Sequence, residues 1–253
     1  METINTLLLT QARTGSTRLP GKVLLKIGEN ELLKIHLDRL KKCTFVDKIL
    51  VATTVADEDD AIIALSEKCG VGTSRGSVND VLDRFYQAAR PFSPQWVIRV
   101  TSDCPLIDPK IIDAVIAMAQ VNDVDYCSNV LIEEFPDGQD VEVFKFSALE
   151  KAWNETKVKS DREHVTPFIV NNTNFNGGEL FKAVNFPCFS NFSAIRMTVD
   201  EPRDFELMQK LVEELGTEQN WITYTNHIIN SGLHKINSDI IRNEGLLISL
   251  KND

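Results

Sequence analysis

The run Thr6-Leu-Leu-Leu-Thr10 leads directly into Gln11-Ala-Arg-Thr-Gly-Ser-Thr-Arg-Leu-Pro-Gly-Lys22, and this stretch decides the expected fold. The first part is a short apolar run, which is typical of a buried strand. The second part is a polar loop with two glycines and three cations. In parallel α/β sheets, ligands bind where strands end and such loops begin. The stretch therefore predicts a ligand site after the first strand.

The same strand pattern recurs along the chain and alternates with amphipathic helical patterns. Leu33, Leu37 and Leu40 share one face of such a helix. This alternation predicts an α/β fold with a mostly parallel sheet that helices cover on both faces. Further strands are expected at 48–53, 96–101, 124–127 and 194–199, and helices are expected to begin near Asp108-Pro109, near the capping-box pattern Ser147–Glu150, and at Pro202.

Composition limits the class of protein. The chain has 253 residues, a formal net charge of −10 and 43% hydrophobic residues, so it has ample material for a core and is not intrinsically disordered. It has no apolar run of about 18 residues and no basic region before Leu7, so we expect neither a membrane span nor a secretory signal. The acidic balance argues against nucleic-acid binding. Five scattered cysteines suit reduced thiols, and we expect a cytoplasmic enzyme.

The loop after the first strand has the chemistry of a polyphosphate site. Arg13, Arg18 and Lys22 supply positive charge, and the hydroxyls of Ser16 and Thr17 add donors. The spacing of its glycines differs from that of a Walker A loop, and Lys22 is followed by Val instead of Ser or Thr. A basic surface turn is the alternative. Three cations within ten residues of an acidic protein favour phosphate binding.

Two aspartates stand where expected strands end. Asp103 follows the run at 96–101, and Asp200 follows the run at 194–199. Mg²⁺ prefers one or two carboxylates together with phosphate oxygens, so the pair could hold one divalent ion. A turn-forming role for Asp103 and a helix-capping role for Asp200 are the alternatives. Asp108 and Asp204 are explained by helix caps and helix dipoles.

Two further segments are polar where a core pattern would be apolar. Asp140 and Glu142 lie on one face of an expected strand. The segment 160–167 brings together Arg162, Glu163 and His164, and either a capping box formed by Ser160 with Glu163 or a site loop explains it. By contrast, His36 fits a core position, and Cys104 has no base nearby in the sequence.

These segments together resemble the cytidylyltransferases of the spore-coat-polysaccharide type, which are related to the CMP-Kdo and acylneuraminate cytidylyltransferases. The resemblance runs from about residue 5 to 210. The motifs that carry it are Arg13–Lys22, Arg75-Gly-Ser-Val-Asn-Asp-Val-Leu-Asp-Arg84, Thr101–Pro109, Asp137-Gly-Gln-Asp-Val-Glu-Val143, Arg162-Glu-His-Val-Thr-Pro167 and Thr198-Val-Asp-Glu-Pro202.

The resemblance implies a three-layer αβα Rossmann-like nucleotide-diphospho-sugar transferase fold with a mostly parallel mixed sheet. It implies one domain over 1–253, with an irregular sugar-binding and dimerisation subregion around 130–195. It further implies a homodimer that transfers CMP from CTP to the anomeric hydroxyl of an acidic sugar, with Mg²⁺ as cofactor and pyrophosphate as the leaving group. A nonulosonic acid for a surface glycan is the expected acceptor.

The resemblance also assigns roles to residues. Catalysis falls to Arg13, Arg18, Lys22 and Asp103, and the metal to Asp103 and Asp200. The residues expected to bind the nucleotide are Gln11, Ala12, Arg13, Gly15, Ser16, Thr17, Arg18, Lys22, Arg75, Gly76, Ser77 and Asp103, and those expected to bind the sugar are Gln139, Asp140, Glu142, Arg162, Glu163 and His164.

Three alternatives remain open. A nucleotidyltransferase that uses another triphosphate would share the loop and the aspartates, since base selectivity depends on few contacts. A glycosyltransferase of the same fold commonly has an Asp-x-Asp metal motif, which Asp103-Cys-Pro lacks. A non-catalytic nucleotide-binding domain would be expected to have lost one of the charged groups. The pair Asn79-Asp80 and the stretch 171–193 do not match the family pattern.

Overall fold

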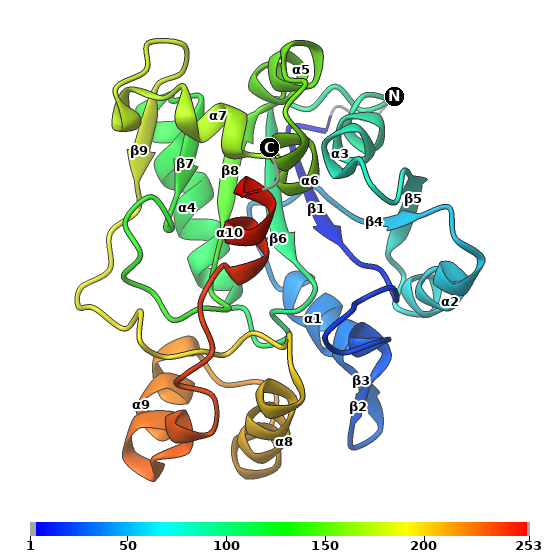
Figure 1. The fold of residues 1–253 in the computed structure, drawn as a ribbon, viewed down its shortest axis with the longest axis vertical. Coiled ribbons are helices and arrows are strands. Elements are labelled where there is room, and N and C mark those ends of the chain that lie inside the picture. Colours follow the sequence, from blue (N-terminus) through cyan, green and yellow to red (C-terminus); the bar gives the residue numbers. More distant parts are fainter. Residues whose placement is uncertain (1–3, 252–253) are drawn as a thin grey trace.

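A seven-stranded mixed sheet forms the centre of the molecule (Figure 1). The computed structural model describes residues 4–251. Within this sheet, as far as residues 4–251 describe it, six strands run in one direction and only β8 is antiparallel to its neighbours. The expected mostly parallel α/β sheet is therefore confirmed. In spatial order the strands are β5 (Gly72–Gly76), β4 (Lys48–Thr54), β1 (Thr6–Gln11), β6 (Trp96–Thr101), β8 (Glu142–Lys145), β7 (Tyr126–Ser128) and β9 (Ala183–Asn185).

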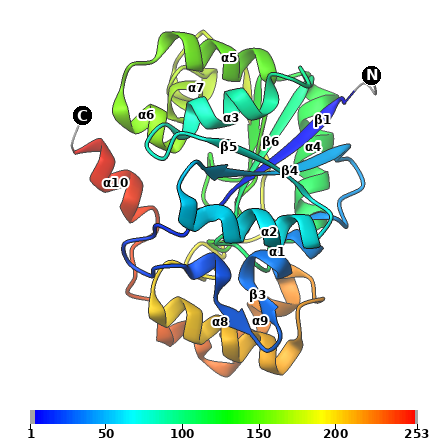
Figure 2. The same cartoon turned by 90° about the vertical axis from the view of Figure 1, so that its right-hand side faces the viewer.

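Helices pack on both faces of this sheet and bury two separate cores (Figure 2). The central strands are apolar on both sides, and Leu7 and Leu8 of β1 are fully buried in different cores. This is the pattern of a parallel strand covered on both faces. One face carries α1 (Leu32–Leu40), α2 (Asp60–Lys68) and α4 (Pro109–Asn122), and the other carries α3 (Val81–Ala89), α5 (Phe146–Glu155), α6 (Lys159–His164) and α7 (Pro167–Asn171).

A third core lies beyond the sheet, under α8 (Pro202–Leu215) and α9 (Trp221–Ser231). The segment 194–199 contributes Ile195, Met197 and Val199 to it. The expected strand there is wrong, because the segment makes only one isolated bridge, between Arg196 and Asp137. Its alternating apolar residues face the helices of the third core instead of a sheet.

The N-termini of four helices test the capping residues that the sequence predicts. The side chain of Asp108 caps α4 as expected, and α8 begins at Pro202 with a capping box between Glu201 and Asp204. The capping box expected at Ser147 is wrong, and of the two interpretations of 160–167 the capping box of Ser160 with Glu163 does not form. Neither α5 nor α6 has a side-chain cap at its N-terminus.

The remaining elements are short. The irregular stretch 171–193 contains η3 (Asn174–Asn176) and adds β9 to the edge of the sheet, parallel to β7. Strand β7 begins two residues later than expected. No helix within residues 4–251 is long and apolar enough to cross a membrane. The other elements are η1 (Lys22–Leu24), the hairpin of β2 (Lys26–Ile27) and β3 (Asn30–Glu31), η2 (Asp57–Asp59), η4 (Leu233–Ile236) and α10 (Glu244–Leu250).

Candidate active site

A cavity of about 1230 Å³ opens at the carboxyl ends of β1 and β6. The loop after β1, the start of α3, helix α6 and helix α10 form its walls. In Figure 1, α10 lies in front of the sheet beside α6. The cavity contains both positive and negative side chains from at least six separate parts of the chain, which is typical of a site for charged ligands.

The loop after β1 reaches this cavity as the sequence predicts. Its backbone is fixed by Asp59, which accepts hydrogen bonds from the backbone N–H and the hydroxyl of Thr14, both at 2.7 Å. Gly21 adopts a positive φ of 68°, which permits the turn into η1. Of the residues expected to bind nucleotide, Gly15 does not line the cavity, whereas the following do: Gln11, Ala12, Arg13, Ser16, Thr17, Arg18 and Lys22.

Lys22 joins the two predicted metal ligands. Its Nζ lies 2.9 Å from Oδ2 of Asp103 and 2.7 Å from Oδ1 of Asp200, so the two carboxylates converge on one point. Burial opposes the charged form of Asp103, but the Lys22 ammonium and the hydrogen bonds to the carboxylate together hold the pKa of Asp103 well below its usual range. Burial likewise opposes the charge on Lys22, and the two carboxylates raise its pKa. Lys22 and Asp103 therefore form a charged pair at neutral pH.

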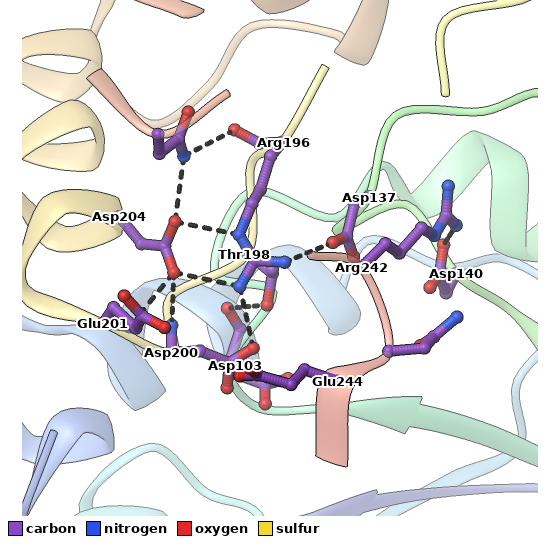
Figure 3. Close-up of polar contacts among 12 residues, drawn as sticks. Asp103, Asp137, Asp140, Arg196, Thr198, Asp200, Glu201, Asp204, Arg242 and Glu244 are labelled. Carbon is purple, nitrogen blue, oxygen red and sulfur yellow. Dashed lines mark hydrogen bonds and ion pairs between the residues drawn. The ribbon is translucent and has the colours of Figure 1, made fainter. Parts of the chain in front are cut away.

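Arg196 forms a second charge network next to this centre, which sequence reasoning missed (Figure 3). Its guanidinium contacts Asp137 at 2.5 Å, Asp200 at 3.0 Å and Asp204 at 2.9 Å. Burial disfavours this charge, but the hydrogen bonds that Arg196 donates to Asp204, together with the charges of the surrounding carboxylates, raise the pKa of Arg196. Arg196 donates to Oδ2 of Asp200 and Lys22 donates to Oδ1, so the two cations together fix this carboxylate. Asp204, expected only to favour the helix dipole, takes part in it.

The far side of the cavity holds the acids expected to face the sugar. Asp140 Oδ1 accepts a hydrogen bond from Arg242 at 2.7 Å, and Glu142 pairs with Arg99 and accepts a hydrogen bond from the Tyr126 hydroxyl at 2.6 Å. Burial raises the pKa of Asp140 to about 7. Arg242 opposes this shift, and neighbouring acids add to it. Both acids line the cavity as predicted.

Besides Gly15, four predicted site residues do not line the cavity. The guanidinium of Arg75 is held by the carbonyls of Thr54 and Ala56 and by Asp60, so it fastens the loop after β4. Gln139 is fully buried and bonds to the backbone of Leu106 and Asp108, which is a structural role. Gly76 and Ser77 do not line the cavity either.

The segment 160–167 forms the short helix α6 on the cavity wall, close to α10. Arg162 Nε donates to Asp80 at the start of α3 at 2.6 Å, so it ties α6 to α3. Ser249 of α10 donates to Glu163 at 2.9 Å and also contacts His164 at 3.1 Å. The cluster therefore belongs to the cavity, and its contacts in the structure are with protein groups.

The buried thiol and imidazole near the site are structural, as expected. Burial raises the pKa of Cys104 well above its usual value, so it is a neutral thiol and a poor nucleophile. His36 is fully buried between the Thr10 hydroxyl and the Cys104 carbonyl, each 2.9 Å away. Neither side chain offers a charged group to a substrate.

Asp103 and Asp200 by themselves supply only part of the coordination shell of a divalent cation. No group of three or more His, Cys, Asp or Glu side chains within residues 4–251 is arranged to hold a metal. Two convergent carboxylates are nevertheless the protein ligands that Mg²⁺ uses when phosphate oxygens complete its shell. The site therefore fits Mg²⁺ that arrives with a nucleotide.

Comparisons with known proteins agree with this geometry. A family model described as cytidylyltransferase matches residues 7–233. The chain is 32% identical over 222 residues to the spore coat polysaccharide biosynthesis protein SpsF of Bacillus subtilis, covering 83% of this chain and 87% of that protein. A shorter match, 36% over 111 residues, is to the 3-deoxy-manno-octulosonate cytidylyltransferase of Anaeromyxobacter dehalogenans, covering 43% and 45%. The solved structure of a cytidylyltransferase from Leptospira borgpetersenii superposes with a TM-score of 0.85 at 30% identity, covering 96% of this chain and all of that one.

Proposed function

The chain belongs to the cytidylyltransferase family, and from this we propose that it transfers CMP from CTP to the anomeric hydroxyl of an acidic sugar, with Mg²⁺ as cofactor. The reaction forms a bond between the sugar oxygen and the α-phosphorus. It breaks the bond between the α- and β-phosphates, and it releases pyrophosphate and the hydroxyl proton. The observation that carries the proposal is the convergence of Asp103, Asp200 and Lys22 beside the cationic loop.

The cationic groups are placed to stabilise the leaving pyrophosphate. Arg13 and Arg18 lie on the loop that borders the cavity, and Lys22 lies at its base. Donors that are already in place when charge develops on a leaving group lower the barrier most effectively. Arg18 contacts Asp200, Glu201 and Glu244 in the ligand-free protein, so a triphosphate would exchange these acids for its own oxygens.

Asp103 and Asp200 would hold Mg²⁺ against the phosphates. A bound Mg²⁺ would neutralise phosphate charge and so assist attack at the α-phosphorus. Within the chain, Lys22 pairs with both carboxylates and Arg196 pairs with Asp200, so both carboxylates are oriented before the nucleotide arrives. With the cation bound, Lys22 would be free to contact the phosphates.

The acidic character of the sugar is supported by a cation at the sugar side of the cavity. Arg99 lines the cavity and pairs with Glu142, so a guanidinium group that suits a carboxylate stands beside an acid that suits a hydroxyl. The similarity to a protein named for an eight-carbon sugar acid points the same way.

The test is pyrophosphate release from CTP with a panel of 2-keto-3-deoxy sugar acids of eight and nine carbons. Each acid is paired with its methyl ester, which keeps the anomeric hydroxyl and removes the charge. We expect Mg²⁺-dependent turnover with at least one acid and a loss of about 100-fold or more with its ester, since a buried guanidinium would lose its partner. Equal rates with acid and ester would contradict an acidic acceptor. Turnover only with neutral sugars would do the same.

A further inference from the structure

Asp140 is an acid of the cavity wall with one carboxylate oxygen bound and the other open. Its Oδ1 accepts a hydrogen bond from Arg242 at 2.7 Å, whereas its Oδ2 has no partner within residues 4–251 and is not buried. The side chain is 29% exposed and lines the cavity. An open carboxylate oxygen of this kind can accept a hydrogen bond or a proton from a ligand.

The loop 137–140 places Asp140 against the segment that leads to Asp200. Gly138 in this loop has a φ of 106°, and a Cβ there would lie 2.7 Å from the carbonyl carbon of Met197. Only a glycine allows both this conformation and this close approach. The loop is therefore packed directly on the backbone that carries one of the two predicted metal ligands.

The charge of Asp140 also acts on the residue next to the other predicted metal ligand. Burial raises the pKa of Cys104, and the charges of Asp103 and Asp140 add to this shift. Figure 3 shows Asp140 and Arg242 beside Asp137, next to the charge network around the two metal-binding aspartates. Asp140 thus lies close both to the expected metal and to β8, where the sugar is expected.

The proposed reaction releases a proton from the anomeric hydroxyl, and several acids of the cavity are unsuited to take it. Both oxygens of Glu142 are in use, one by the Tyr126 hydroxyl and one by Arg99. Despite burial, the Lys22 ammonium and hydrogen bonds hold the pKa of Asp103 well below its usual range. A carboxylate with a low pKa is a weak base.

The surroundings of Asp140 make it a stronger base. Burial raises its pKa to about 7, Arg242 opposes this shift, and the charges of Asp137, Glu142 and Glu133 add to it. A general base is most effective when its pKa is close to the pH of the reaction. Asp137 is itself ion-paired and its side chain is only 10% exposed, so it is less open to a substrate.

We propose that Asp140 is the general base of the transfer and that its open oxygen, Oδ2, takes the proton of the anomeric hydroxyl. The inference rests on the proposed CMP transfer. The sugar oxygen bonds to the α-phosphorus as pyrophosphate leaves, and the hydroxyl proton passes to Asp140, which later returns it to water. Arg242 is a positioning residue, because it holds Oδ1 and so leaves Oδ2 directed to the acceptor.

The experiment is the pH dependence of pyrophosphate release from CTP with Mg²⁺ and the 2-keto-3-deoxy sugar acid that reacts fastest in the panel above. In the wild type, kcat/KM for this acid should fall about tenfold per pH unit below about pH 7, because protonated Asp140 cannot accept the proton. In Asp140→Asn we expect this decline to be absent and kcat to be about 100- to 10,000-fold lower. The KM for the acid and the CTP affinity by calorimetry should stay within about threefold of wild type, since asparagine keeps the shape of the side chain.

Two further variants separate this role from a structural one. Arg242→Met removes the charge that opposes the raised pKa of Asp140, so the decline should begin about one pH unit higher. A merely structural role of Arg242 would not move the profile. Asp38→Asn is the matched control, because Asp38 lies on α1 outside the cavity and pairs with Lys34 and Lys41. It should change neither kcat nor the pH profile.

Several results would overturn the assignment. A kcat of Asp140→Asn within about tenfold of the wild type, or the same decline below pH 7 in both proteins, would show that another group takes the proton. A raised KM with an unchanged kcat would make Asp140 a sugar-binding group only. If Asp140→Asn fails to fold, Arg242→Met decides, and an unshifted decline there contradicts the proposal. A wild-type protein that releases no pyrophosphate with any acid would instead overturn the proposed function, and this is seen before any variant is made.

Discussion

At the scale of single residues, Lys22 has two roles that it cannot fill at the same time. In the ligand-free protein it neutralises Asp103 and Asp200, and during the proposed reaction it stabilises the leaving pyrophosphate. A side chain with a raised pKa suits both tasks, because it carries its full charge throughout the neutral range. The lysine thus neutralises the two carboxylates until substrate arrives.

Replacing Lys22 by alanine should lower kcat by roughly 100- to 1000-fold, the usual cost of one lost donor at a developing oxyanion. Steady-state pyrophosphate release measures this effect. Lys26→Ala is the matched control, since Lys26 pairs only with Glu31 on the adjacent β3 strand among the described residues. A kcat of Lys22→Ala within about threefold of the control would show that Lys22 has no part in the chemical step.

His36 gives a prediction for stability against pH. Burial lowers its pKa to about 4 from an ordinary value of 6.5, with the hydrogen bond to the Cys104 carbonyl opposing the shift. Between these two pH values the unfolded chain binds a proton and the folded protein does not. The free energy of unfolding should therefore fall as the pH decreases from about 6.5 to 4, by about 3 kcal/mol.

Urea unfolding at a series of pH values tests this dependence. In His36→Gln the part of the slope between pH 6.5 and 4 that belongs to this residue should be absent. His227→Gln is the control, because His227 is partly exposed on α9 beside Glu214. An identical slope in wild type and His36→Gln would mean that the imidazole titrates normally in the fold.

At the scale of elements, some of the site could be predicted from the sequence and some could not. The loop 11–22 and Asp103 follow strands of a parallel sheet, and carboxyl ends of parallel strands meet at one edge. Asp200 reaches the same point although its segment forms no strand. Its position was predicted for a partly wrong reason, because alternating apolar residues also suit an extended segment packed on helices.

The missed residues share a different property. Arg196 pairs with Asp137 across 59 positions, and Arg242 pairs with Asp140 across 102. Neither pair has a local signature, since each depends on the way the third core and the C-terminal segment return to the sheet. Arg84 was quoted as part of a motif without a role. In the sequence, Arg84 lies among the apolar residues of an expected helix. Only the structure shows that two of its guanidinium N–H donors are buried without a partner.

Helix α10 illustrates an element with a competing contact. It closes one side of the cavity, and its Glu244 lies 3.2 Å from Arg18. A triphosphate must displace this acid to reach the guanidinium. In Glu244→Gln we therefore expect CTP to bind about two- to fivefold more tightly, the range of an exposed ion pair.

The comparison is a titration with CTP against Glu206→Gln, a change to an acid on α8 whose partner is Lys210. The control should not alter affinity. Weaker binding in Glu244→Gln would show that α10 contributes directly to nucleotide binding and does not compete with it.

At the scale of the whole molecule, one cavity joins the two centres of the proposed reaction. The phosphates and the metal would lie at Asp103 and Asp200, and the sugar would lie at the β8 end. In this arrangement the α-phosphorus of the nucleotide would face the acceptor. The homodimer, by contrast, stays a prediction that the oligomeric mass in solution would test.

The most direct measurement is calorimetric titration of the full chain with CTP, UTP, GTP and ATP, each with Mg²⁺ and again with EDTA, in wild type and Asp103→Asn. We expect Mg²⁺-dependent binding with a preference for CTP of about tenfold or more, and loss of the Mg²⁺ effect in Asp103→Asn. Absence of triphosphate binding, together with tight binding of a nucleotide-sugar, would contradict the proposed CMP transfer and favour a glycosyltransferase.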